Sequence, residues 1–486
     1  MNLARLARWG LFATLALCAC ATTPAQASGR CDRLLTLLRT QLADATCVES
    51  ADLTTANPAT TPADNSLAGL PAFAFTPQTD RSTIAPAPAS RTPITHAVPG
   101  VQIQARFAQD PLGEGRVLLR LPDSWNGRLV VAGASGTRSE FNGDFAWSDY
   151  VLQEGYAYVS QNKGIYNLQL STAADPLGCR LNPSSTIYVH FYDNDPAALF
   201  TRWTEAIQGA SRLGHEALEL YYGRSPARTY AVGTSNGGYQ VRRAMETAPD
   251  LFDGGVDWEG TYVDPRTGGI LASLPPALLN YPDYVASGFD PNSTAAKNIV
   301  AAGYPPDIVA GTNSLWGQYW AEFWEVTQCQ WQKRLDPTYD TYGAGLANYV
   351  YVAREAASDV DADLAAIATT GRIRRPLVTV AGTMDALLPI NDQARAYARA
   401  VAAHAGERDG APYRLYEVQN GNHIESYKVN FPELELIEPH AQKAFDLLVA
   451  YVERGASLPP DQCIPHGGAI AGNPAEPGHC TALYVP

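Results

Sequence analysis

Residues 228–255 read RTYAVGTSNGGYQVRRAMETAPDLFDGG, passing from apolar β-formers through a cluster of small residues into a helical pattern. At the turn, Gly233-Thr234-Ser235-Asn236-Gly237 matches G-x-S-x-G between an expected strand and an expected helix. Glycines permit a sharp turn that lifts a serine hydroxyl clear at a helix N-terminus, where free N–H groups stabilise an anion. The stretch therefore predicts that Ser235 is a nucleophile. The alternative is a glycine-rich turn that carries an ordinary serine.

Apolar segments alternate with helical patterns on both sides of this turn. GRLVVAGASG (127–136) and GYAYVSQNKG (155–164) are expected strands before it, and RPLVTVAGTMD (375–385) and YRLYEVQNGNH (413–423) are strand-then-loop segments after it. Strands that are apolar on both faces and alternate with helices indicate a mostly parallel sheet covered on both sides. We therefore predict an α/β-hydrolase fold, with its core in residues 99–259 and 371–460.

A serine hydroxyl needs a base to take its proton, and that base needs an orienting carboxylate. In α/β-hydrolases the three residues follow in the order serine, acid, histidine. Asp385 and His423 each come just past one of the two late strands, so we predict Ser235, Asp385 and His423 as the catalytic residues. A turn-capping role is the alternative for Asp385.

Other acids and histidines fit these roles less well. Glu259, just past the strand that follows Ser235, is the second candidate for the acid, whereas Asp361 and Asp363 come ahead of the acid-bearing strand. The remaining downstream histidines lie in expected helices or in the tail delimited by the last two cysteines. They are His404, His440, His466 and His479.

An oxyanion hole needs two backbone donors aimed at the developing negative charge. One is expected from the N–H of Asn236, which directly follows the nucleophile. The other is expected from Ala134-Ser135-Gly136, after an apolar strand, with Ser135 as the candidate and its two neighbours left open.

Composition restricts the class of protein. The chain has 486 residues, of which 46% are hydrophobic and 17% charged, as in ordinary globular proteins. Its formal net charge is −14 and no Lys/Arg-rich run occurs, so nucleic-acid binding is not expected. No cofactor or metal site and no transmembrane segment are predicted, the expected partner is a small or oligomeric substrate, and the oligomeric state stays open.

The N-terminus and the cysteines indicate export, to the periplasm or the extracellular space. Residues 1–27 combine two arginines with a short apolar run and read as a signal peptide, with lipidation at Cys20 as the alternative. The six remaining cysteines are even in number and none forms a C-x-x-C pair, which favours disulfides over zinc or redox chemistry. Proximity along the chain suggests Cys31–Cys47 and Cys463–Cys480, leaving Cys179–Cys329, among fifteen arrangements.

Three further segments complete the predicted organisation. Residues 28–98 include long Pro/Thr/Ala-rich stretches and are expected to be a loosely packed lead-in, and residues 461–486 a disulfide-bearing tail. Residues 260–370 break the alternation and include LWGQYWAEFWEVTQCQWQ (315–332), so they are expected to form an inserted cap. Trp316, Trp320 and Trp258 are candidate substrate contacts, and the alternative is that the clustered aromatics pack on each other as the cap's own core.

Four stretches resemble the 3-hydroxybutyrate oligomer hydrolases: WNGRLVVAGASGTRSEF (125–141), SNGGYQVRRAME (235–246), PLVTVAGTMDALLPI (376–390) and AFDLLVAYVERGASLPP (444–460). This resemblance implies an exported α/β-hydrolase that cleaves short hydroxyalkanoate esters, and it places the family's serine, aspartate and histidine on Ser235, Asp385 and His423.

A weaker resemblance, through DADLAAI (361–367) and the aromatic insertion, is to the tannase and feruloyl esterase family. That family carries a disulfide beside its nucleophile and its histidine. Thr234 and Ile424 occupy those positions here, so this disulfide is not expected.

The sequence thus predicts a serine esterase that forms an acyl-enzyme, with short hydroxyalkanoate oligomers as the expected substrates. Hydrolysis of aromatic esters or other polyesters, or amidase or peptidase activity on the same three residues, remains an alternative because substrate choice resides in the cap. The alternative outside enzymes is a catalytically inactive hydrolase fold that serves as an exported binding protein.

Overall fold

The structure is a computed structural model that describes residues 29–61, 92–136, 139–141, 143–165, 168–170, 188–190, 200–339, 348–406 and 410–486. The expected signal peptide, Cys20 and Cys179 lie outside the described residues.

A central sheet organises the chain, in the strand order β1-β2-β3-β5-β4-β8-β9-β12-β13-β14. Neighbours from β1 to β5 pair antiparallel, and those from β5 through β14 pair parallel. This mostly parallel sheet confirms the predicted fold class. Its strands are β1 (Leu42–Ser50), β2 (Gly100–Phe107), β3 (Arg116–Pro122), β4 (Arg128–Ala132), β5 (Ala157–Gln161), β8 (Arg228–Thr234), β9 (Gly254–Trp258), β12 (Leu377–Gly382), β13 (Tyr413–Val418) and β14 (Gln462–Ile464).

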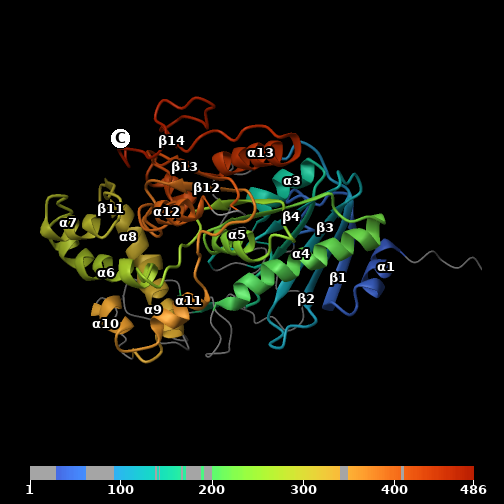
Figure 1. The fold of residues 1–486 in the computed structure, drawn as a ribbon, viewed down its shortest axis with the longest axis horizontal. Coiled ribbons are helices and arrows are strands. Elements are labelled where there is room, and N and C mark those ends of the chain that lie inside the picture. The colour runs from blue at the N-terminus through green and yellow to red at the C-terminus, as the bar shows by residue number, and fades with distance from the viewer. Residues whose placement is uncertain are drawn as a thin grey trace, which may run out of the picture.

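Helices cover both faces of the sheet (Figure 1). Successive strand residues point to opposite faces, so Val131 of β4 packs in the cluster that holds α4 and α5, while Val130 packs in the cluster that holds α13. The strand residues are buried on both faces of the sheet, which explains why the parallel strands are apolar at consecutive positions. The covering helices are α1 (Arg30–Leu37), α3 (Asp149–Gln153), α4 (Thr201–Tyr222), α5 (Asn236–Thr247), α12 (Ala394–His404) and α13 (Glu438–Arg454).

The sheet extends beyond the expected core at both ends. Within the expected lead-in, β1 pairs with β2, and α1 buries Leu34 in the same cluster as the sheet. A disulfide between Cys31 and Cys47 joins α1 to β1. Residues 30–50 are therefore packed rather than loose, because their apolar side chains and the disulfide fix them on the sheet edge. Likewise, β14 lies within the expected tail and pairs with β13.

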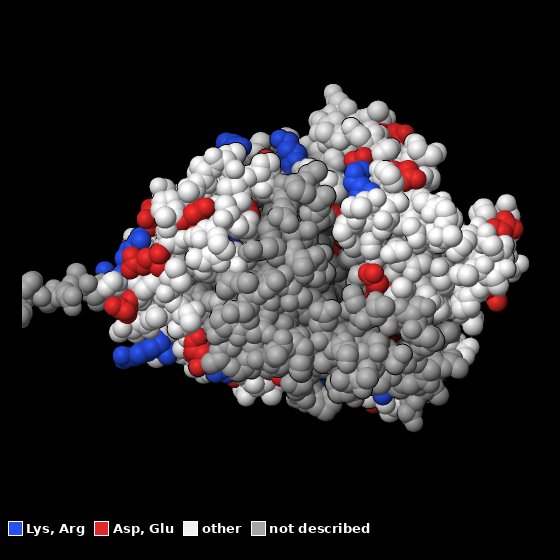
Figure 2. Space-filling view, turned by 180° about the vertical axis from the view of Figure 1, so that it is seen from behind, with Lys and Arg blue, Asp and Glu red and all other residues white. Residues whose placement is uncertain are grey.

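The segment between β9 and β12 forms the cap, at the left and lower left of Figure 1. A buried aromatic cluster fills it, including Tyr281, Trp316 and Trp324. On the cap's side of the molecule, at the right of Figure 2, the described surface is white with scattered acidic side chains. Its elements are α6 (Ile270–Ala286), α7 (Thr294–Ala301), β10 (Val309–Ala310), β11 (Asn313–Ser314), α8 (Leu315–Tyr319), the π-helix η3 (Trp320–Trp324), α9 (Glu325–Leu335), α10 (Tyr351–Glu355) and α11 (Val360–Ala366).

Smaller elements complete the described chain. They are the paired strands β6 (Leu168–Leu170) and β7 (Tyr188–His190), the π-helix η2 (Asp144–Ser148) and the 3₁₀ helix η5 (Glu425–Val429). Throughout the described ranges, no helix combines the length with the apolar composition that crossing a bilayer requires.

Candidate active site

Ser235 occupies the sharp turn between β8 and α5. Its backbone has φ 59° and ψ −121°, a left-handed conformation that a non-glycine residue rarely adopts, and its N–H donates to the Trp258 carbonyl at 2.9 Å. Close packing requires a glycine at position 237, because a Cβ there would lie 2.7 Å from the Gly133 carbonyl oxygen. The turn thus holds Ser235 directly before the first residue of α5.

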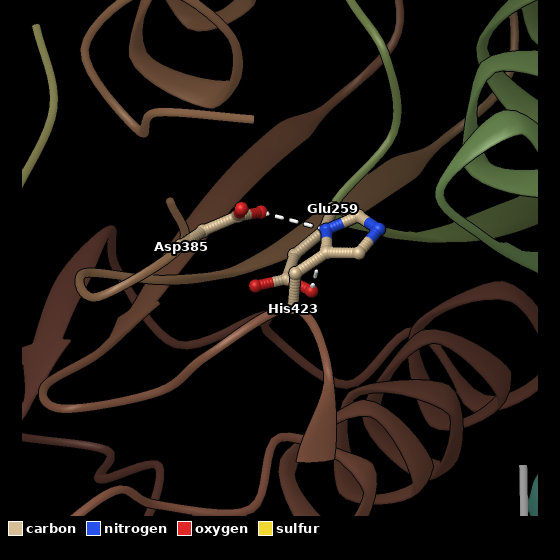
Figure 3. A group of neighbouring side chains, drawn as sticks. All are labelled: Glu259, Asp385 and His423. Carbon is tan, nitrogen blue, oxygen red and sulfur yellow. Dashed lines mark hydrogen bonds and ion pairs between the residues drawn. The ribbon is translucent and has the colours of Figure 1, made fainter. Parts of the chain in front are cut away.

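Asp385 and His423 form a buried pair. Asp385 Oδ2 lies 2.8 Å from His423 Nδ1 (Figure 3), and Asp385 Oδ1 accepts the N–H groups of Leu387 at 2.8 Å and Leu388 at 2.7 Å. Both side chains are buried. Two amides thus orient the carboxylate on one oxygen and leave the other for the imidazole, which suits a carboxylate that fixes the tautomer of a base.

Glu259 approaches the same imidazole nitrogen from the end of β9. Its Oε2 lies 3.5 Å from His423 Nδ1 (Figure 3), while its Oε1 accepts the Gly382 N–H at 3.0 Å. Burial, and secondarily the charge of Asp385, raises the pKa of Glu259 well above its ordinary value. The second candidate acid of the sequence therefore lies beside the first, and both contact one histidine.

The parallel strands explain why these residues meet. Ser235, Glu259, Asp385 and His423 each follow the carboxyl end of a strand, in the spatial order β8, β9, β12, β13. The loops after the strands are joined by backbone hydrogen bonds, from Glu259 N to Val380 O at 2.9 Å and from Met384 N to Gly421 O at 2.8 Å. These bonds bring His423 back across β12 to the end of β9, the strand next to that of Ser235.

No hydrogen bond joins the Ser235 hydroxyl to the imidazole, and both side chains belong to the described part of the chain. Serine and histidine of such sites often lie further apart without substrate than during reaction. The ligand atoms of Glu259, Asp385 and His423 lie within 4.8 Å of one another, a spacing that metal sites also show. The 2.8 Å contact has the length of a hydrogen bond, and it is the interaction that we assign to the pair.

The loop after β4 is fixed by side chains of two other elements. The Ala134 N–H donates to Gln240 Oε1 of α5 at 2.9 Å, so that amide has a partner within the protein. The buried Lys163 ammonium donates to the carbonyl oxygens of Ser135, at 2.7 Å, and Gly136, and lies 5.0 Å from the ring centroid of Trp203. Of the three residues considered for the second oxyanion donor, Ala134 thus has its N–H engaged by Gln240.

Two of the three candidate tryptophans, Trp258 and Trp316, are buried. Trp316 is 1% exposed, and its indole N–H donates to the Pro305 carbonyl at 3.1 Å. Trp320 is partly buried and stacks on Tyr281 with ring centroids 5.0 Å apart, while Trp258 is buried beside the sheet. The arrangement of Trp316 matches the alternative that these aromatics form the cap's own core.

Trp324 connects the cap to the site. Its indole N–H donates to the carbonyl of Ala386, directly after Asp385, at 2.8 Å. Tyr319 of the cap donates its hydroxyl to Asn422, directly before His423, at 2.8 Å. Neither residue was among the sequence candidates, nor were Lys163 and Gln240. The QNKG stretch that carries Lys163 lies at a strand end, which is the one local signal available.

Cys463 and Cys480 form a disulfide, and Cys329 is disulfide-bonded. The predicted partner of Cys329, Cys179, lies outside the described residues, so that pairing stays a prediction.

Comparisons with known proteins agree with the resemblance seen in the sequence. A family model described as 3HB-oligomer hydrolase matches residues 307–485. D-(-)-3-hydroxybutyrate oligomer hydrolases are 32% identical over 109 residues in Burkholderia thailandensis and 31% identical over 124 residues in Burkholderia ambifaria. These matches cover 21% and 24% of this chain but only 15% and 18% of the relatives' length.

Among solved structures, feruloyl esterase B from Aspergillus oryzae aligns over 88% of this chain and 91% of its own, with a TM-score of 0.50 and 14% identity. At that identity the likeness concerns the fold, and it confirms the α/β-hydrolase architecture.

Proposed function

We propose that this protein is a serine ester hydrolase that acts on short hydroxyalkanoate oligomers of the 3-hydroxybutyrate type. The observation that carries the proposal is the 2.8 Å contact between Asp385 and His423 along the same sheet edge as the strained Ser235 turn. Each part alone has a structural explanation, but together they supply a nucleophile, a base and an orienting acid in the expected order.

In the proposed reaction, Ser235 Oγ attacks the ester carbonyl carbon while His423 Nε2 takes the hydroxyl proton. Asp385 accepts the Nδ1–H and stabilises the imidazolium. The amides of Asn236 and of the loop at Ser135 or Gly136 bind the oxyanion. As the intermediate collapses, His423 returns the proton to the departing alcohol. Water then attacks the acyl-enzyme with the same base, which releases the acid and restores the serine.

The choice of substrate rests on similarity. The family model and the curated relatives carry the name of hydroxybutyrate oligomer hydrolases, and the model match includes Asp385 and His423. The cap that fastens to both loops is rich in buried aromatics, which suits an apolar polyester backbone better than a charged ligand.

We also propose export. The apolar N-terminal run after two arginines, together with the disulfides Cys31–Cys47 and Cys463–Cys480, supports passage into an oxidising compartment.

The test is to rank hydroxybutyrate dimers and trimers, aromatic esters and amides by kcat/KM. We expect an oligomer to rank first. An aromatic ester that exceeds the best oligomer by about a hundredfold would overturn the substrate class.

The same panel tests the nucleophile with p-nitrophenyl butyrate. Because Ser235→Ala removes the attacking oxygen, kcat should fall by roughly 10⁴-fold or more. Equal rates in the two proteins would refute the assignment of Ser235. Absence of turnover by the wild-type protein on the whole panel would favour a binding protein.

A further inference from the structure

We propose that Glu259 is a second positioning carboxyl for His423, which lies beside Asp385 at the imidazole and replaces Asp385 when that carboxylate is lost. The proposal rests on the proposed function, because it concerns the base of that reaction. It assigns a role to a buried acid that the reaction as described above does not use.

The geometry of Glu259 is that of a fixed group. Its backbone has a positive φ of 51°, and its N–H donates to Val380 O, so the main chain is tied to β12. The Gly382 N–H binds Oε1 and directs the carboxyl group toward the histidine. The other oxygen, Oε2, is buried and has no hydrogen-bond partner among the described residues.

That oxygen faces the imidazole nitrogen which already bonds Asp385. Glu259 Oε2 stands 3.5 Å from Nδ1, against 2.8 Å for Asp385 Oδ2. Figure 3 shows the two carboxyl groups approaching the ring from different strand ends. A rotation of the ring that broke the contact to Asp385 would thus meet the second carboxyl within the same buried space.

Electrostatics explain why two acids are tolerated here. Like charges close together in a buried site do not both ionise readily. Burial, followed by the charge of Asp385, raises the pKa of Glu259 well above its ordinary value. Removing the Asp385 charge removes one of the causes of that increase. The pKa of Glu259 then falls, which favours the carboxylate that the imidazolium requires.

The test is a double-mutant cycle of Glu259→Gln, Asp385→Asn and both together, measured as kcat and KM on p-nitrophenyl butyrate. We expect Glu259→Gln alone to lower kcat by less than about threefold with KM unchanged, and Asp385→Asn alone to lower it by about 10²-fold. The double variant should lose about 10⁴-fold, the loss typical of a histidine without its acid. The combined loss then exceeds the product of the single losses.

Glu246→Gln is the matched control. Glu246 is also a buried glutamate whose carboxyl accepts two backbone N–H groups, those of Thr370 at 2.9 Å and Gly371 at 2.8 Å. Burial raises its pKa as well. It contacts α12 through Tyr397 rather than the imidazole. Combined with Asp385→Asn, this control should multiply the single effects without excess.

A second readout needs no substrate. The Nδ1 proton of a carboxylate-bound histidine resonates far downfield in ¹H NMR, and we expect this signal in the wild-type protein and in Asp385→Asn, but not in the double variant. A double variant within about threefold of Asp385→Asn in kcat, with the same downfield signal, would overturn the role of Glu259. If the wild-type protein turned over no ester, the proposed function would fail while the NMR series still decided the role of Glu259.

Discussion

The two sides of the proposed active site are stabilised by different physical means. The nucleophile side comprises Ser235 and Asn236, the loop 133–136, and the residues that hold that loop, Gln240 and Lys163. Backbone contact holds it, with Gly237 against Gly133 and one buried ammonium on two carbonyl oxygens. The imidazole side comprises His423, the buried acids Glu259, Asp385 and Glu438, and the partly buried Glu425.

The charges on the imidazole side depend instead on the protonation of its acids. Glu425, two residues after His423, accepts the N–H groups of Ile437 at 2.6 Å and Glu438 at 2.8 Å. Burial raises the pKa of Glu425 to about 7, and burial together with the charge of Glu425 raises the pKa of Glu438 to about 9. Close packing thus fixes the geometry of the nucleophile side, whereas pH changes the charge of the acids on the imidazole side.

Among the tests of this comparison between the two sides, the largest effect is expected where the turn and the oxyanion loop are in closest contact. Gly237→Ala places a Cβ 2.7 Å from the Gly133 carbonyl oxygen, which forces the turn and the oxyanion loop apart. A displacement on the order of 1 Å costs about 10²-fold in rate, so kcat on p-nitrophenyl butyrate should fall by that factor.

Gly472→Ala is the control for Gly237→Ala, because a Cβ there meets nothing within 4 Å. Wild-type kcat in Gly237→Ala would show that the turn and the loop move independently, and the contrast between the two sides would then disappear.

A smaller loss is expected from Lys163→Met, which removes both hydrogen bonds to the Ser135 and Gly136 carbonyls. The loop then loses its orientation, and kcat should fall by about 10- to 30-fold with KM little changed, less than the loss of a whole oxyanion donor. Inactivation by a phosphonate ester, whose adduct uses the same oxyanion hole, should slow by the same factor.

Lys428→Met is the matched control for Lys163→Met, since Lys428 also donates to two backbone carbonyls, those of Pro432 and Leu434. Equal losses in the two variants would attribute the effect to general stability rather than to the oxyanion loop.

The smallest effect concerns stability on the imidazole side. In the unfolded chain Glu438 ionises near its ordinary pKa of 4.5, whereas the folded protein keeps its proton up to about pH 9. The folded state therefore binds more protons between these values, and stability falls as pH rises. Glu438→Gln removes this dependence. Between pH 6 and 8 the wild-type free energy of unfolding should fall relative to the variant by on the order of 1 kcal/mol per pH unit.

Urea denaturation at several pH values measures this difference. Glu453→Gln serves as the control of opposite sign, because the hydrogen bond from Arg128 lowers the pKa of Glu453 and its contribution is constant above pH 6. Parallel stability curves for wild type and Glu438→Gln would contradict the prediction.

The sequence predicted the architecture because each parallel strand can be recognised from its own apolar residues. Positions such as Val130 and Val131 are both apolar, and each expected strand ends in the loop that carries a site residue. The same reasoning identified both Asp385 and Glu259 but treated them as rivals. Only the backbone bonds between the ends of β9, β12 and β13 show that the two acids share one histidine.

What the sequence missed depends on contacts between distant segments. Residues 42–50 show little strand character alone, and they become an edge strand because β2 offers a pairing surface some fifty residues later. Lys163 reads as an ordinary loop lysine until its ammonium is seen against carbonyls 27 and 28 residues earlier. Tryptophan is a residue type common in binding sites, yet Trp316 is buried like a core residue.

The last residues of the chain have a practical importance for anyone who prepares this protein. Val485 exchanges hydrogen bonds with the Asn420 side chain, and the Leu483 carbonyl accepts the Thr383 hydroxyl. Thr383 and Asn420 belong to the loops that carry Asp385 and His423. Shortening the chain by four residues would remove these hydrogen bonds from both loops. The choice of the end point of an expressed chain therefore concerns the site as well as the yield.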